Sequence, residues 1–184
     1  ARFSGASVTL ISYPSDVSLG IGKAVYAILQ DGGVEKIRSI EGTLAQLAYL
    51  GECYVRGTKL YEEAPENAAE IRAITAKLYE KDEASDAWKV YAEGRDINLK
   101  YFKEVAARLG SRFDAFIFES EAGVEGKKII LENTPSVFKQ SDGAYIYEGE
   151  QDGLHTRVFI NHEGYPTYEA KDVGLMSLKF KTYS

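Results

Sequence analysis

Short β-rich runs near both ends of the chain flank a long middle part in which apolar residues recur every three or four positions. Residues 8–13 form the first such run and predict a strand that Pro14 ends. Residues 19–30 have helical periodicity, and Gly32 and Gly33 predict the end of that helix. This order of elements predicts an α/β protein. Because the sequence contains no repeat, low-complexity stretch or linker, we expect one compact unit.

The middle of the chain is dominated by predicted helices. Residues 43–50 predict a short helix that Gly51 ends, and residues 65–80 predict a second one. A longer helix is predicted over 84–109, with Gly110 as its end. Its apolar residues share one face, which we expect to belong to the core: Trp88, Tyr91, Leu99, Phe102, Ala106 and Leu109.

The last third of the chain returns to short extended runs. Residues 113–121 predict a strand followed by a turn, and residues 124–133 predict a helix. Two further strands, 144–148 and 154–160, flank residues 150–153, where an Asp-Gly pair is typical of a hairpin turn.

Composition narrows the class of protein. The 184 residues are 45% hydrophobic and 27% charged, as in ordinary globular domains, and no apolar run approaches the ~20 residues of a membrane span. A single cysteine, Cys53, excludes an internal disulfide and fits a reducing compartment. A net charge of −6 does not indicate a nucleic-acid binder acting alone. The first residues resemble neither a signal peptide nor a natural start, so we expect part of a longer protein.

Several polar residues suggest chemistry but favour plainer roles. The run from Gly20 to Lys23 lacks the glycine spacing and the following Ser or Thr of a phosphate loop, so we expect a helix start that packs closely on a strand. Asp16 precedes the same helix and is expected to cap it. Glu119 and Glu121 share one side of a strand, and we expect acidic edge or helix-start positions rather than an acid–base pair.

Arg95 and the two histidines have no obvious catalytic context. Arg95 lies on the apolar face of its helix, where we expect it to pair with a carboxylate or extend to solvent, with a tRNA contact as the second choice. His155 is expected on a strand face and His162 in a turn, and neither neighbours a serine or cysteine that would suggest a triad. With one cysteine and two histidines, the sequence also lacks the four Cys or His ligands that a structural zinc site uses, so we expect none.

Tyr168 and Asp172 are four residues apart at the start of a predicted last helix, after the strand 154–160. That spacing places a phenol and a carboxylate on one face, one turn apart. The carboxylate offers two acceptor oxygens to a guanidinium, and the phenol adds a polar contact or a flat wall. From spacing alone, a half-buried tyrosine beside a solvated aspartate is the commoner explanation.

The surrounding stretch, VFINHEGYPTYEAKDVG at residues 158–174, resembles a motif of arginyl-tRNA synthetases. Similar segments of that family are matched by residues 5–24, although Ser15 and Ser18 stand where glycines are usual, by the FD and ES pairs within 113–120, and by DGA at 142–144. The resemblance runs from Gly5 to the end of the chain.

The resemblance implies part of a class I synthetase catalytic domain of Rossmann type, with an inserted helical part at about 41–110 and a strand, hairpin and helix part at 111–184. The family activates arginine with ATP and magnesium and transfers it to tRNA in the cytoplasm, without a covalently bound cofactor or membrane. Tyr168 and Asp172 would then contact the side chain of the substrate arginine. No catalytic or metal-ligating residue is implied within this chain.

The family's two ATP-binding signatures are missing from the sequence. Neither the His-Ile-Gly-His nor the Lys-Met-Ser-Lys-Ser pattern occurs, and residues 175–179 match only a few letters of the second. We therefore expect the chain alone to be inactive, as an internal fragment whose ATP and anticodon contacts lie elsewhere. A non-catalytic binding or interaction module that uses the helices over 65–109 is the alternative.

Overall fold

The computed structural model describes residues 2–183, which fall into two compact units. Asp16–Arg112 form the helical unit, and residues 2–15 together with 113–183 form the sheet unit. The expectation of one compact unit is wrong, because the apolar residues of the middle helices cluster with one another. The helical unit also includes residues 16–40, which precede the predicted inserted part.

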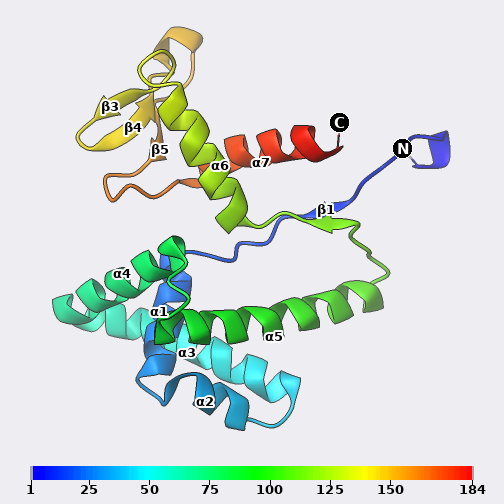
Figure 1. Cartoon of the computed structure of the whole chain (residues 1–184), viewed down its shortest axis with the longest axis vertical. Coiled ribbons are helices and arrows are strands. Elements are labelled where there is room, and N and C mark those ends of the chain that lie inside the picture. Colours follow the sequence, from blue (N-terminus) through cyan, green and yellow to red (C-terminus); the bar gives the residue numbers. More distant parts are fainter. Residues whose placement is uncertain (1, 184) are drawn as a thin grey trace. The chain divides into compact units, whose positions relative to one another are not determined.

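The helical unit consists of five helices gathered around the first of them (Figure 1). Their bounds are α1 Leu19–Leu29, α2 Gly33–Ser39, α3 Thr43–Glu63, α4 Pro65–Glu80 and α5 Asp86–Arg108. Helix α1 is the most apolar, and its central residues are almost completely buried. The core gathers buried side chains from all five helices: Val25, Ile28, Ile37, Cys53, Ile71, Leu78 and Val90.

Glycines allow the helices to approach α1 closely. A Cβ atom at Gly57 of α3 would lie 2.0 Å from the carbonyl oxygen of Lys23, and one at Gly22 would lie 2.0 Å from Oγ1 of Thr75 in α4. The glycine-lined start of α1 therefore packs on helices. The sequence had suggested packing on a strand, and that prediction is wrong. Close packing against α4 explains why residue 22 is a glycine. A phosphate-binding role is not needed to explain it.

Helix α3 continues through Gly51, so the predicted end at residue 50 is wrong. A Cβ atom at Gly51 would meet nothing within 4 Å, which shows that this glycine faces open space. A glycine inside a helix costs only about 1 kcal/mol relative to alanine. Burial of Cys53 and the approach of Gly57 to α1 hold the helix beyond this point.

Asp16 does not cap α1. Ser18 is the N-cap, and its hydroxyl accepts from the backbone N–H of Ile21. Asp16 is instead buried, with Oδ2 3.2 Å from Nε of Arg95 and 3.4 Å from the hydroxyl of Tyr91. The prediction that Arg95 pairs with a carboxylate is confirmed.

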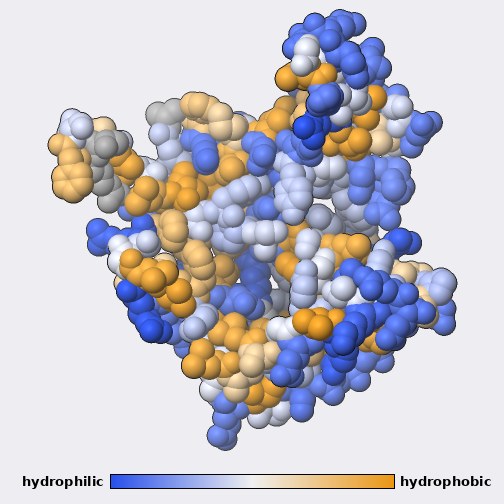
Figure 2. All heavy atoms as spheres, turned by 180° about the vertical axis from the view of Figure 1, so that it is seen from behind, coloured by the Kyte–Doolittle hydropathy of each residue, from blue (hydrophilic) through white to orange (hydrophobic). Residues whose placement is uncertain are grey.

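The predicted apolar face of α5 is core only in its first half. Tyr91 is buried beside Trp88, with ring centroids 5.0 Å apart, whereas Phe102 and Leu109 are exposed. Gly110 adopts a positive φ of 72°, and its N–H donates to the carbonyl of Ala107, so the predicted helix end is correct. Large apolar side chains also reach the surface elsewhere in both units, where Figure 2 shows apolar residues among polar ones.

The sheet unit contains two small sheets and two long helices. Strands β1, Ile11–Ser12, and β2, Ala115–Phe116, pair in parallel, with Ile11 opposite Ala115. Strands β3, Lys139–Ser141, β4, Ala144–Tyr147, and β5, Arg157–Ile160, form an antiparallel sheet in that order. The helices are α6, Glu119–Glu132, and α7, Tyr168–Tyr183, and short 3-10 helices cover Arg2–Ser4 and Glu150–Asp152.

The predicted strands of this unit are longer than the observed ones. Only two residues of 8–13 and two of 113–121 are in strands, and α6 begins five residues before the predicted start at 124. His155 lies outside β5 and is exposed, so its predicted place on a strand face is wrong, while His162 is in a turn as predicted. None of the helices among residues 2–183 has the length and apolar content that a bilayer crossing requires.

Helices α6 and α7 cross in backbone contact. A Cβ atom at Gly126 would lie 1.9 Å from the carbonyl oxygen of Ala170, and one at Gly174 would lie 1.9 Å from that of Ala122. Ala122 and Ala170 are themselves completely buried. Small residues on both helices therefore fix the position of α7 against α6.

Candidate functional site

The loop before α7 is held by its own hydrogen bonds. Oδ1 of Asn161 accepts from the backbone N–H groups of Glu163 and Tyr165, which closes an Asx-type turn. Gly164 has a φ of 83°, a conformation that favours glycine, and its carbonyl accepts from Nζ of Lys127 at 2.8 Å. The segment GYP in the sequence thus folds into an ordered turn between β5 and α7.

Thr167 ties the start of α7 to β5. Its hydroxyl donates to the carbonyl of Val158 at 2.7 Å, and its backbone N–H donates to the carbonyl of Phe159 at 2.9 Å. The carbonyl of Thr167 in turn accepts from the N–H of Lys171, which begins the hydrogen-bonding of the helix. Strand β5 therefore sets where the first turn of α7 lies.

Tyr168 and Asp172 occupy this first turn. Tyr168 is the first residue of α7, and Asp172 follows one turn later on the same face. Both are exposed, Tyr168 at 71%, and within residues 2–183 neither side chain has a hydrogen bond or ion pair. The arrangement leaves a flat ring and two carboxylate oxygens open to a ligand.

Lys171 and Glu119 form a buried ion pair beneath this face. Nζ of Lys171 lies 2.7 Å from Oε2 of Glu119, and the two side chains are only 7% and 8% exposed. The hydroxyl of Ser15 donates to the same oxygen at 2.9 Å. Lys171 also reaches the candidate site, because its Nζ lies 5.5 Å from the ring centroid of Tyr168.

The sequence placed Glu119 among helix-start positions but did not reveal its partner. Glu119 is the first residue of α6, where a carboxylate interacts favourably with the helix dipole. Lys171 comes 52 residues later and looks like an ordinary surface lysine in the sequence. Glu121, which was considered with Glu119, accepts from the N–H of Phe118 and so caps α6.

A second Glu–Lys pair joins the same two helices further along α7. Glu125 of α6 accepts from Lys181 and, at 2.8 Å, from the hydroxyl of Ser177. The hydrogen bond from Lys181, followed by that from Ser177, lowers the pKa of Glu125 below its usual value. This pair is largely exposed on the lysine side, in contrast to the buried pair at Lys171.

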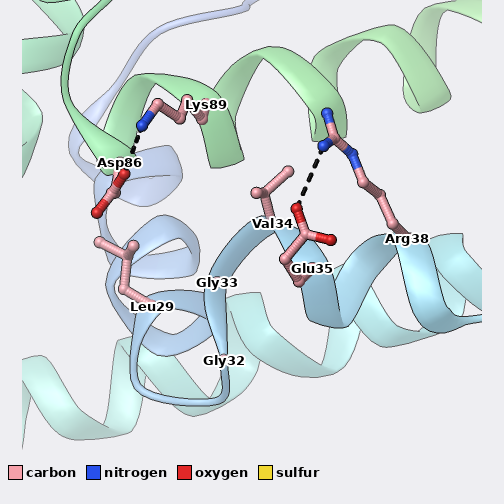
Figure 3. A pocket seen from close by; sticks show the side chains of 8 residues that line it. All are labelled: Leu29, Gly32, Gly33, Val34, Glu35, Arg38, Asp86 and Lys89. Atoms are coloured by element: carbon pink, nitrogen blue, oxygen red, sulfur yellow. Dashed lines mark hydrogen bonds and ion pairs between the residues drawn. The ribbon is translucent and has the colours of Figure 1, made fainter.

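The helical unit has a pocket whose lining includes none of the predicted site residues (Figure 3). Leu29 and Val34 provide its apolar lining, beside Gly32 and Gly33. Its charged groups are paired with one another: Lys89 with Asp86 at 2.8 Å, and Arg38 with Glu35 at 3.3 Å and with Glu93 at 2.7 Å. Each charged side chain of the lining therefore has an ion-pair partner, and nothing in this pocket points to a particular ligand.

Comparisons with known proteins bear on the whole chain. No family model matches it. Curated relatives named arginine–tRNA ligase match it over its full length: 26% identity in Exiguobacterium sp. and 27% in Halothermothrix orenii, where it covers 32% and 31% of those proteins. The chain thus spans about a third of the length of these relatives.

Solved structures give the same result for the fold. An arginyl-tRNA synthetase from Plasmodium falciparum superposes with a TM-score of 0.70 at 15% identity, over 97% of this chain and 29% of that one. A putative arginyl-tRNA synthetase from Campylobacter jejuni gives 0.57 at 17% identity, over 99% and 38%. The resemblance to arginyl-tRNA synthetases is confirmed by both comparisons.

Proposed function

We propose that this chain, which is related to arginyl-tRNA synthetases in sequence and fold, is part of an arginine–tRNA ligase. We propose further that it contains the residues that bind the side chain of the substrate arginine. In this proposal Asp172 pairs with the guanidinium and Tyr168 forms the adjoining wall. The observation that carries it is the exposed phenol and carboxylate on one face of the first turn of α7, inside the stretch that resembles the family motif.

The proposed pair explains why arginine would be preferred to related amino acids. A carboxylate accepts two parallel hydrogen bonds from a planar guanidinium, which the ammonium group of lysine cannot donate in the same geometry. Citrulline has a similar shape but no charge, so the carboxylate of Asp172 would lose its ion pair. Such a mismatch costs on the order of 1–3 kcal/mol.

The complete reaction belongs to the whole ligase. We propose that ATP and its magnesium ion, the 3′ end of tRNA and the α-amino and carboxylate groups of arginine contact mainly residues outside these 184. The parallel pair β1–β2 would then be a piece of a Rossmann-type sheet, and the helical unit an insertion between its strands. A cytoplasmic location follows from the same proposal, since tRNA charging takes place there.

A titration with arginine, followed by NMR chemical shifts of backbone amides, tests the binding role. We expect weak, millimolar binding with shifts centred on Tyr168 and Asp172, and none with lysine or citrulline. Asp172→Asn should weaken binding at least tenfold, because the charged hydrogen bonds are lost. Glu169→Gln is the matched control on the same helix and should bind arginine normally. Equal binding by Asp172→Asn would refute the assignment of this carboxylate.

A second test concerns activity. We expect no arginine-dependent exchange between ATP and pyrophosphate from the purified chain, because neither ATP-binding signature occurs in its sequence. A complete arginyl-tRNA synthetase assayed in parallel should be active. Exchange above background by the chain alone would show that it holds an ATP site and is not an inactive part.

A further inference from the structure

We propose that Glu119 is a positioning residue that acts on the substrate arginine through Lys171. The carboxylate of Glu119 neutralises the ammonium of Lys171, which would otherwise repel the guanidinium from Tyr168 and Asp172. The inference rests on the proposed function. It concerns a residue that makes no contact with the ligand and that the motif around α7 does not include.

The geometry begins with the position of the lysine. Lys171 lies between Tyr168 and Asp172 in sequence, yet its side chain turns inward while theirs are exposed. The lysine stem passes Gly123 of α6, where an added Cβ atom would lie 3.7 Å from Cγ of Lys171, an ordinary contact distance. The ammonium, paired with Glu119, lies 5.5 Å from the ring centroid of Tyr168.

Glu119 is the group that balances this charge. Its Oε2 accepts hydrogen bonds from the ammonium of Lys171 and the hydroxyl of Ser15. Because Lys171 and Glu119 are both buried, solvent screens their charges little. An uncompensated buried charge acts over a longer range than an exposed one. The charge that the candidate site experiences from Lys171 therefore depends on Glu119.

The size of the effect follows from the distance. A guanidinium within about 6 Å of the Tyr168 ring centroid lies on the order of 10 Å from Nζ of Lys171. At an effective dielectric constant of about 20, repulsion between two unit charges at that separation weakens binding on the order of tenfold. Loss of the Glu119 charge should therefore raise the dissociation constant of arginine by about that factor.

The variants Glu119→Gln, Lys171→Met and the double variant separate charge from structure. Glu119→Gln should weaken arginine binding on the order of tenfold. Lys171→Met should bind arginine at least as well as the unaltered chain, since it leaves a buried anion. The double variant should return to within about twofold of the unaltered chain, because both charges are gone. Glu125→Gln, in the other Glu–Lys pair of these helices, should have no effect.

The titration with arginine distinguishes the outcomes. Binding by folded Glu119→Gln that equals that of the unaltered chain would overturn the inference but not the proposed function. A purely structural role would make Lys171→Met and the double variant bind arginine more weakly than the unaltered chain. That result would also overturn the inference, and it can be obtained even where Glu119→Gln fails to fold. No arginine shifts in the unaltered chain would overturn the proposed function and the inference together.

Discussion

Replacement of Gly126 by alanine should destabilise the sheet unit substantially, although alanine is the better helix former. The added methyl carbon would lie 1.9 Å from the carbonyl oxygen of Ala170 and 2.7 Å from its carbonyl carbon. Ordinary contact begins near 3.4 Å, so α7 would have to move by roughly 1.5 Å. The obstacle is backbone, and no side-chain rotation can relieve it.

Two opposing terms set the magnitude. Alanine favours the helix by about 0.5–1 kcal/mol relative to glycine. Overpacking of a tight core costs about 1–3 kcal/mol, and displacement of α7 adds lost contacts around the buried Ile130 and Ala122. The two terms leave a net cost of about 0–2.5 kcal/mol, to which the lost contacts add, so we expect the free energy of unfolding of the sheet unit to fall by about 1–3 kcal/mol.

Native-state hydrogen exchange of the slowest amides in α6 and α7 measures this change within the unit concerned. Gly51→Ala is the matched control, because Gly51 is also inside a helix but faces open space. It should stabilise the helical unit by about 0.5–1 kcal/mol in urea unfolding monitored through Trp88, the only tryptophan. If Gly126→Ala left the exchange of α6 unchanged or slower, the argument from backbone contact would be refuted.

Three further predictions concern the helical unit. Arg95→Met should lower its free energy of unfolding by about 3 kcal/mol in urea titrations, because Asp16 keeps a buried charge without its guanidinium; a change below ~1 kcal/mol would contradict this. Burial, then the nearby Asp16, raises the pKa of Tyr91, so the stability of the helical unit should be full below the unfolded pKa near 10 and fall as pH rises above it. Urea unfolding monitored by circular dichroism across pH 9–12 should show this fall in the unaltered chain and a smaller fall in Tyr91→Phe. An equal fall in both would count against it. Ser18→Ala should cost about 1 kcal/mol by thermal unfolding, with Ser18→Gly milder, since the cap of the Ile21 N–H is lost.

The helices were largely predictable because their signals are local. Helix α4 has the predicted bounds, and α1 and α5 end within a residue or two of prediction, where Pro65, Gly32 and Gly110 mark helix starts and stops. The predicted helix end at Gly51 was wrong for a physical reason. A glycine ends a helix where the chain needs a positive φ, and Gly51 does not adopt one. Sequence alone does not show which of the two situations applies.

The site was predictable only in part. The position of Tyr168 and Asp172 on one helical turn followed from their spacing, and their exposure fits a ligand-facing role that titration can test. Asp16 and Glu119 were both assigned to helix starts, because the sequence shows an acid near a helix but not a partner 79 or 52 residues away. Long-range ion pairs of this kind depend on the fold and have no local pattern.

The pairing of β1 with β2 has a consequence for the order of folding. The two strands are adjacent in the sheet, yet the whole helical unit lies between them in the chain. Closing a loop of about 100 residues costs roughly 4 kcal/mol of chain entropy beyond a constant term. At about 5–20 residues per second, β1 is synthesised some 5–20 seconds before Ala115. During that interval the helical unit is synthesised from α1 onward, and its first helices can begin to pack on one another, while the first strand has no partner because β2 has not yet been synthesised.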